Sequence, residues 1–350
     1  MSRNRRLSKH LLTITMTLLL AACAGGPDPR EPGHGFEHDI PGEAVPWTHT
    51  DFDDSADKFT FAVFSDLTGG EREGVFAVAV EQLRLLRPEF IVNVGDLIEG
   101  GTKDMARLAA EWDSFDRRAG RARAPVFYTG GNHDLTNPVM WEVWEQRYGR
   151  RYYHFMYKDV LFLVLDTEDN TAEGQERIHE IREASMEVIE ARGWGVFEET
   201  GYGRLEERVT GRVSAQQAAY FREVLAANPD TRWTFVLMHK PAWERPGEEN
   251  FAIIEAALDG RPYTVFYGHE HAYLHQQRHG QDYIRLATTG GVQVEGKPMA
   301  FDHVTLVTVD GRGVDIANLR LSGILDKTGE LPLNGKELCF ELAVCGTPAH

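Results

Sequence analysis

The chain has 350 residues, of which 42% are hydrophobic and 26% are charged. This composition is typical of globular proteins and excludes disordered, collagen-like and heptad-repeat chains. The 37 basic and 54 acidic residues give a formal net charge of −17, and a field of that sign repels nucleic acid. We therefore expect no nucleic-acid binding.

The first 22 residues have the three parts of a secretory signal. Four basic residues within positions 3–9 precede a ten-residue apolar run, 11–20, and small residues then lead to Cys23. At about 1.5 Å per residue this run is too short to cross a bilayer core of roughly 30 Å. The exit, Leu20 to Cys23, resembles the lipobox of bacterial lipoproteins, which implies cleavage before Cys23 and its acylation. Plain secretion with an incidental cysteine is the alternative.

The residues after Cys23 favour an anchored protein on a spacer. Ala24 resembles the outer-membrane sorting pattern of Gram-negative lipoproteins, so we expect a lipid anchor, the cell envelope and a periplasm-facing position at the outer membrane. Residues 23–57 contain five prolines and little apolar periodicity, which predicts an extended tether. We expect a signal peptide at 1–22, this tether, one catalytic domain at 58–320 and a C-terminal extension at 321–350.

From Phe59 onward, short apolar runs alternate with segments of helical periodicity. The expected strands are Phe59–Phe64, Phe90–Val94, Pro125–Thr129, Val160–Leu165, Trp233–Met238 and Tyr263–Tyr267. The expected helices cover residues 74–86, 105–115, 138–147, 214–227 and 249–258, and residues 303–318 predict a hairpin that turns at Asp310-Gly311. This alternation predicts an α/β domain with central mixed β-sheets sandwiched by helices.

Two segments depart from this rhythm. Residues 170–212 are rich in Glu and Arg, and we expect surface decoration there, with a lid over a site as the alternative. Cys339 and Cys345 lie six residues apart near the C-terminus, so they form either a small disulfide loop or two free thiols. Three cysteines in all are too few for a disulfide scaffold or a thiolate metal cage.

Five of the expected strands run directly into polar residues. These are Asp66, Asp96, Asn132 with His133 and Asp134, His239, and His269 with His271. If the strands lie mostly parallel, their carboxyl ends open on one edge of the sheet, where α/β proteins bind ligands. Burying so many carboxylates and imidazoles is costly unless a cation neutralises them. Oxygen and imidazole donors without thiolate favour a divalent ion of Mn, Fe or Zn in a catalytic site.

These motifs, in this order, resemble those of the calcineurin-like metallophosphoesterases, over roughly Phe59 to Asn318. The resemblance implies a four-layer arrangement of the sheets and helices. It also implies that Asp96 bridges two metal ions. One ion would take Asn132, His239 and His269, and the other would take Asp66 and His271. By the same resemblance, the catalytic residues would be His133, which stabilises the phosphoryl group or protonates the leaving oxygen, and Asp134, which orients that imidazole.

The chain departs from the family at one ligand position. The family commonly has Asp-x-His where this chain has Asp66-Leu67-Thr68. Purple acid phosphatases lack that histidine too, but they supply a tyrosine at the position that is Glu99 here. Water, Glu99 or Thr68 could fill the gap, or the metal at that position could bind weakly. The Gly69-Gly70 pair that follows lets the backbone approach the site, whereas Gly290-Gly291 indicates only a loop.

The function expected from this pattern is hydrolysis of a phosphomonoester, phosphodiester or pyrophosphate by metal-activated water. The substrate would be a phosphorylated small molecule or an envelope component, and the lipid anchor would provide the membrane contact. One alternative is a catalytically weak metal- or ligand-binding lipoprotein on the same fold. Another is a dinuclear hydrolase of some other ester or amide.

Overall fold

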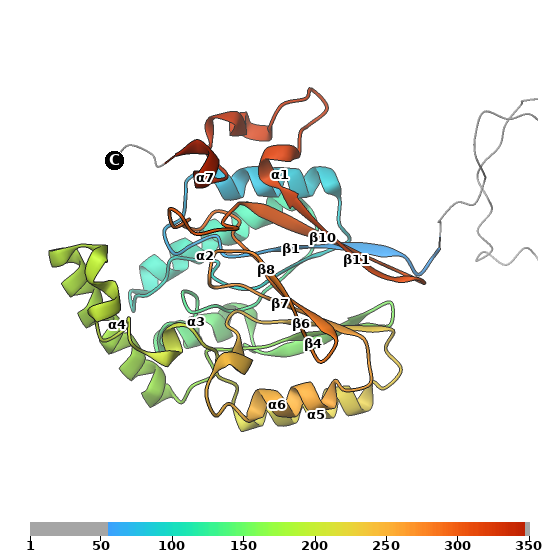
Figure 1. The fold of residues 1–350 in the computed structure, drawn as a ribbon, viewed down its shortest axis with the longest axis horizontal. Helices are drawn as coiled ribbons and strands as arrows, with labels where there is room; N and C mark the ends of the chain where they lie inside the picture. The colour runs from blue at the N-terminus through green and yellow to red at the C-terminus, as the bar shows by residue number, and fades with distance from the viewer. Residues whose placement is uncertain (1–54, 347–350) are drawn as a thin grey trace, which may run out of the picture. The chain divides into compact units, whose positions relative to one another are not determined.

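The computed structural model describes residues 55–346 (Figure 1). The predicted signal peptide, the lipidation site Cys23 and nearly all of the predicted tether lie outside these residues. Within the described part of the chain, no helix has both the length and the apolar composition that a membrane span requires.

Two β-sheets form the centre of the domain. The first has the strand order β11-β10-β1-β2-β3, and the second has the order β4-β5-β6-β7-β9-β8. Strands β1, β2 and β3 are parallel, as are β5, β6, β7 and β9, while β10, β11, β4 and β8 are antiparallel to their neighbours. The strands are β1 (Phe59–Phe64), β2 (Ile91–Asn93), β3 (Val126–Phe127), β4 (Tyr153–Tyr157), β5 (Val160–Val164), β6 (Trp233–Leu237), β7 (Tyr263–Tyr267), β8 (Leu274–Arg278), β9 (Gln281–Arg285), β10 (His303–Asp310) and β11 (Gly313–Arg320).

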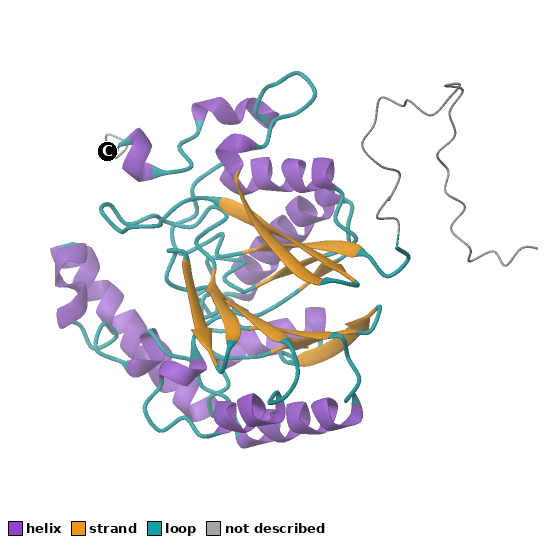
Figure 2. Cartoon of the chain, turned by 45° about the vertical axis from the view of Figure 1, so that its right-hand side comes forward, coloured by secondary structure: helices purple, strands orange, loops and turns teal. Residues whose placement is uncertain are grey.

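Helices cover the outer face of each sheet, and the two inner faces pack on each other (Figure 2). The helices are α1 (Val75–Leu86), α2 (Met105–Ala119), α3 (Pro138–Tyr148), α4 (Ala172–Arg192), α5 (Ala215–Ala227), α6 (Asn250–Ala257) and α7 (Leu342–Cys345). Apolar residues of α1, α2 and α3 pack against the first sheet, and those of α5 and α6 pack against the second. The predicted mixed sheets sandwiched by helices, in four layers, are therefore confirmed.

Aromatic rings fill the layer between the two sheets. Phe61 of β1 stacks on Phe90, with ring centroids 5.3 Å apart, and it meets the edges of Phe162 and Phe235 at 5.2 and 4.9 Å. All four side chains are buried, so this aromatic layer joins the first sheet to the second. It fixes how the strand ends of the two sheets meet, and therefore positions the site.

The sequence analysis expected the strands that carry the site residues to end on one edge of a single sheet, but they belong to two sheets. β1, β2 and β3 lie in the first sheet, whereas β6 and β7 lie in the second. The carboxyl ends of both parallel sets nevertheless open toward the same region, so the polar residues still meet. The expectation of a single sheet edge is wrong because strand–helix alternation does not record which strands pair.

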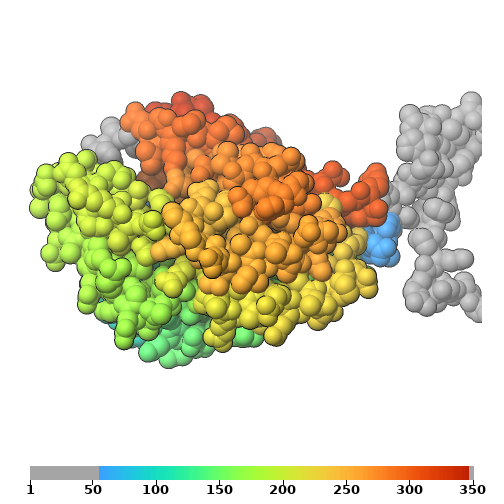
Figure 3. Space-filling model, turned by 60° about the horizontal axis from the view of Figure 1, so that its bottom comes forward, coloured from blue at the N-terminus to red at the C-terminus, as the bar shows by residue number. Residues whose placement is uncertain are grey.

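The insertion at 170–212 folds into helix α4, two short 3₁₀ turns, η2 (Trp194–Glu199) and η3 (Glu206–Arg208), and the loops between them. It forms the yellow-green lobe at the left of Figures 1 and 3. The Thr171 side chain caps α4 by accepting from Gly174 N (3.1 Å). The Gln175 amide donates to the carbonyls of Leu135 and Thr136, at 2.8 and 3.2 Å. The insertion is thus anchored to the loop that carries Asn132 and His133.

Candidate active site

The predicted site residues follow the carboxyl ends of β1, β2, β3, β6 and β7, and the structure brings them together. Asp66, Asp96 and His239 are 0%, 2% and 0% exposed. Asp96, His269 and His271 have left-handed backbones, with φ of 57°, 75° and 51°. Such conformations are uncommon for residues other than glycine and often occur at functional sites.

Two clusters of possible metal-ligand atoms share the carboxylate of Asp96. The first consists of Asp96, His239 and His269, and the second of Asp66, Asp96 and His271. Within each cluster the ligand atoms lie within 4.8 Å of one another. Asn132 belongs beside the first cluster, because its Oδ1 lies 3.0 Å from His239 Nε2. This is the division of ligands that the family resemblance implied.

A main-chain carbonyl fixes each of the four imidazoles. The bonds are His239 Nδ1 to Val94 O (2.8 Å), His271 Nδ1 to Val292 O (2.6 Å), His133 Nδ1 to Glu99 O (2.9 Å) and His269 Nε2 to Arg208 O (2.5 Å). Because a carbonyl can only accept, the bonded nitrogen must carry a proton, and the other nitrogen is left to face the site. Fixing ring orientation and tautomer in this way is what metal-ligating histidines require.

Proton binding compensates the buried charge in the metal-free protein. Burial alone would lower the pKa of His239, but the Asp96 carboxylate, 3.2 Å from its Nε2, raises that pKa to about 9. For Asp96, burial favours a raised pKa, yet His239 and His133 together hold the pKa below its usual range. Burial keeps the pKa of His269 well below its ordinary value, so this ring is neutral. A divalent cation could replace the His239 proton, and the mixed oxygen and imidazole donors suit Mn, Fe or Zn.

His133 stands beside the clusters, with its side chain 17% exposed. Its backbone N–H donates to Asp96 Oδ1 at 2.9 Å. A Cβ added to Gly69 would lie 3.5 Å from His133 Nε2 and 3.3 Å from His271 Cε1. Gly69, which has a φ of 78°, therefore leaves room between these two rings, as the predicted backbone approach requires.

Asp134 does not orient the His133 imidazole, and that prediction is wrong. Its two carboxylate oxygens accept hydrogen bonds from the backbone N–H groups of Gly131, Asp96, Leu97 and Ile98, at 2.8 to 3.1 Å. The imidazole is held by the Glu99 carbonyl instead. Asp134 thus joins the loops after β2 and β3 and holds the backbone of Asp96 in its left-handed conformation.

Neither Thr68 nor Glu99 supplies the ligand that the sequence lacks. The Thr68 hydroxyl donates to Ile98 O at 2.9 Å, and Glu99 Oε1 accepts from Gly70 N and Glu71 N at 3.0 and 2.8 Å. Glu99 therefore fixes the loop after Asp66 and belongs to neither of the two clusters found among residues 55–346, while the Thr68 hydroxyl is bonded to a main-chain carbonyl instead. The second cluster thus offers Asp66, Asp96 and His271 as its possible metal ligands.

The sequence analysis missed the contribution of the insertion. Besides the Arg208 carbonyl on His269, the Glu207 carbonyl accepts from Lys240 Nζ at 2.6 Å. Lys240 also pairs with Glu168 at 2.8 Å, and both side chains are at most 5% exposed. The insertion is therefore more than surface decoration, because it forms one wall of the site. In the sequence, the only signal of this contact between the insertion and the site is the position of Lys240 directly after His239.

Comparisons with known proteins agree with this geometry. The profile of the calcineurin-like phosphoesterase family matches residues 59–273, more than half of the chain. The fold is similar to that of a purple acid phosphatase from yellow lupin (Lupinus luteus) seeds, at 12% identity and a TM-score of 0.52, over 76% of this chain and 52% of that chain.

Two further solved structures match. One is a dimetal phosphatase from Danio rerio, at 15% identity and a TM-score of 0.48, over 75% of this chain and 98% of that chain. The other is a 5'-nucleotidase from Candida albicans, at 12% identity and a TM-score of 0.46, over 79% and 56%. No curated protein sequence matches.

The chain belongs to the calcineurin-like phosphoesterase family. It is a hydrolase that acts on phosphate ester bonds, and its two clusters are the candidate metal centre of that activity.

Proposed function

We propose that the protein hydrolyses a phosphomonoester, a phosphodiester or a pyrophosphate with two divalent cations held by the clusters described above. The observation that carries this proposal is the position of Asp96, whose carboxylate belongs to both clusters. A carboxylate can offer one oxygen to each of two cations. Asn132, His239 and His269 would complete the first position, and Asp66 and His271 the second.

The chain's own residues would prepare the reaction in two ways. Bound divalent cations acidify water and neutralise charge that develops on phosphoryl oxygens. His133, fixed through Nδ1 by Glu99 O, presents Nε2 to the space beside Gly69. With both ring nitrogens protonated, Nε2 could donate a hydrogen bond to a phosphoryl oxygen or a proton to the leaving oxygen.

Chelation tests this proposal directly. We expect a chelator to abolish hydrolysis of p-nitrophenyl phosphate or its bis-ester, and Mn²⁺, Fe²⁺ or Zn²⁺ to restore it. Initial rates would be followed by p-nitrophenolate absorbance, with p-nitrophenyl acetate as the control substrate. Turnover of the acetate but of no phosphate ester would refute the proposal, and so would undiminished phosphate hydrolysis by protein shown to be metal-free.

Metal affinity should rise with pH. Below about 9 the metal-free protein holds a proton on His239, and a cation must displace that proton. Affinity for the first ion should therefore increase by up to about tenfold per pH unit between pH 7 and 9. The raised pKa of His239 also stabilises the metal-free fold. This contribution is fully present at pH values below 6.5, the ordinary pKa of histidine, and is lost as the pH rises through about 9.

Calorimetric titrations with Mn²⁺ in buffers of different protonation enthalpy measure this effect. We expect proton release on binding at pH 7 and much less at pH 9.5. Equal affinity and no proton release at both pH values would show that the metal does not displace a proton from His239.

We further propose that the protein acts in the cell envelope on a phosphorylated small molecule or an envelope component. Support comes from the sequence alone, in the lipobox-like Leu20 to Cys23 and the sorting residue Ala24. Recovery of the Cys23→Ser variant in the membrane fraction, in the same amount as the unchanged protein, would contradict lipid anchoring.

A further inference from the structure

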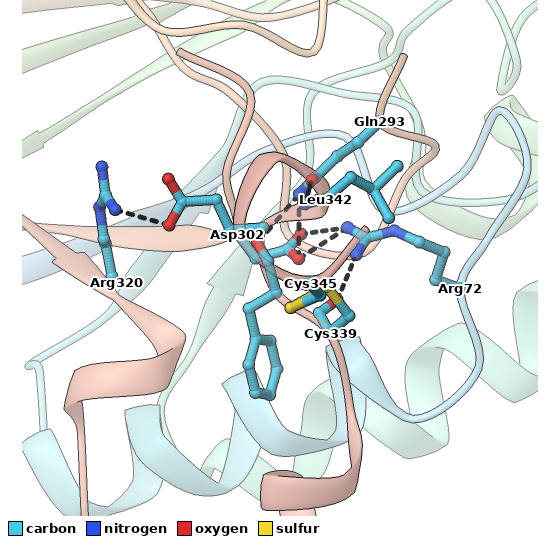
Figure 4. Close-up of a disulfide and its surroundings, with 9 residues drawn as sticks. Arg72, Gln293, Asp302, Arg320, Cys339, Leu342 and Cys345 are labelled. Atoms are coloured by element: carbon cyan, nitrogen blue, oxygen red, sulfur yellow. Dashed lines mark hydrogen bonds and ion pairs between the residues drawn. A yellow bond between two sulfur atoms is a disulfide. The ribbon is translucent and has the colours of Figure 1, made fainter. Parts of the chain in front are cut away.

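The C-terminal end of the described chain is a small loop closed by a disulfide between Cys339 and Cys345, whose Cα atoms are 5.9 Å apart (Figure 4). Its backbone is held by two side chains through three hydrogen bonds. Cys339 O accepts from Arg72 Nη1 at 2.8 Å, and Phe340 O accepts from Gln293 Nε2 at 3.1 Å. Leu342 N donates to Gln293 Oε1 at 3.0 Å. We call this disulfide loop, residues 339–345, the clasp.

An ion pair between the partly exposed Arg72 and the buried Asp302 lies directly beneath the clasp. Arg72 Nη2 lies 2.6 and 2.7 Å from the two oxygens of Asp302, whose side chain is 0% exposed. The same carboxylate accepts from Thr288 Oγ1 at 2.7 Å and from Gln293 Nε2 at 3.2 Å. Asp302 N also donates to Phe340 O at 2.9 Å. A buried network whose members are all paired is rigid, whereas losing one partner is costly.

This network reaches the second cluster of possible metal ligands, Asp66, Asp96 and His271, through residues 289–292. Arg72 donates to Gly290 O from its backbone N (2.8 Å) and to Gly291 O from Nε (3.0 Å). Thr289 N and Gly291 N both donate to Asp66 O, at 3.0 and 3.1 Å.

Within the same segment, Gly291 is packed against the site. A Cβ there would lie 2.6 Å from Thr68 O and 2.9 Å from His271 Cε1. Val292 O receives the Nδ1–H of His271 at 2.6 Å. The Gly290-Gly291 pair is therefore more than a loop, because it positions both Asp66 and His271.

The two clusters are supported differently. Val94 O, from the end of β2, holds His239 of the first cluster, whereas residues 289–292 brace Asp66 and His271 of the second. The second cluster is also the one in which Thr68 stands where the family has a histidine. The family match ends at residue 273, so neither residues 289–292 nor the clasp belong to the matched region.

We propose that the clasp is a positioning element for the second cluster, the one in which Thr68 stands where the family has a histidine. The clasp keeps the side chains of Arg72 and Gln293 in place. These two residues in turn keep residues 289–292 against His271 and Asp66. This inference rests on the proposed function, because it assumes that the Asp66–Asp96–His271 cluster holds a cation.

The test is a stepwise Mn²⁺ titration of the Cys339→Ser/Cys345→Ser variant, with bound metal measured at equilibrium. We expect one of the two affinities to fall by about tenfold, the low end of the loss seen when groups supporting metal ligands are removed. The other affinity should stay unchanged and serves as an internal reference. Lys336→Ala is the matched control, since this side chain is 64% exposed on the same extension and should alter neither affinity.

A second variant keeps the inference testable if the serine variant does not fold. Gln293→Leu leaves the disulfide intact but removes the contacts to Phe340 and Leu342, and it should weaken the same affinity. In a His271→Ala background the serine changes should add no further loss, because the site they support is already broken.

Three outcomes would overturn the inference. Two unchanged affinities in both folded variants would show that the clasp does not position the site. An equal fall in both affinities would show a general loss of stability instead. Failure of the unchanged protein to bind two ions would remove the proposed function itself, and the clasp with it.

Discussion

The Asp96→Asn variant is expected to lose hydrolysis by at least about a thousandfold in kcat/KM. Asp96 is the residue common to both ligand clusters, so one substitution weakens both metal positions. Asparagine has the same shape and also tolerates a φ of 57°, and its oxygen can still accept from His133 N. The fold should therefore survive while the anionic bridge is lost, and metal content and kcat/KM on p-nitrophenyl phosphate would measure the effect.

A matched control separates charge loss at the site from charge loss in general. Asp113→Asn makes the same chemical change at a carboxylate that is 66% exposed and pairs with Arg147 at the surface. It should keep full activity and metal content. If Asp96→Asn retained more than a tenth of the original activity, with its circular dichroism spectrum unchanged, Asp96 could not be the bridging residue.

His133→Ala should lower kcat by about a hundred- to a thousandfold while leaving the metal content unchanged. His133 lies outside both ligand clusters, so its removal spares the ligand atoms of the cations. The size of the loss should depend on the leaving group if His133 donates a proton. An alkyl phosphate, whose leaving oxygen needs that proton, should then suffer more than p-nitrophenyl phosphate. Equal losses would instead assign His133 to the phosphoryl oxygens.

His275→Ala is the control for this prediction, since His275 lies on β8 with its side chain 51% exposed. Both variants would be compared by steady-state kinetics on the two substrates and by elemental analysis. Loss of bound metal in His133→Ala would contradict the separation between ligand and catalytic roles.

Much of the fold could be predicted because its strands are marked by buried apolar runs. β1 and β7 coincide with the expected segments, and β10 and β11 form the expected hairpin, although its turn residues are Gly311 and Arg312, one position beyond the predicted Asp310-Gly311. β8 and β9 were missed because Leu274–Arg278 and Gln281–Arg285 are mostly polar and carry no apolar alternation. Their pairing at the edge of the second sheet is imposed by tertiary structure rather than by local preference.

The site was predictable to the extent that side-chain chemistry marks it. Carboxylates and imidazoles placed after strands indicated Asp66, Asp96, His239, His269 and His271 correctly as neighbours. The carbonyls that orient the rings come from the main chain of Val94, Glu99, Arg208 and Val292, and no residue type signals such a contact. The role of Asp134 was misjudged for a similar reason, because its partners are backbone N–H groups.

Anomalous diffraction from crystals grown with Mn²⁺ tests the central claim most directly. We predict two peaks, one contacted by His239 and His269 and the other by Asp66 and His271, with Asp96 touching both. A map without metal at these clusters, or a structure that places Asp96, Asn132, His239 and His269 beyond reach of a common ion, would contradict the account.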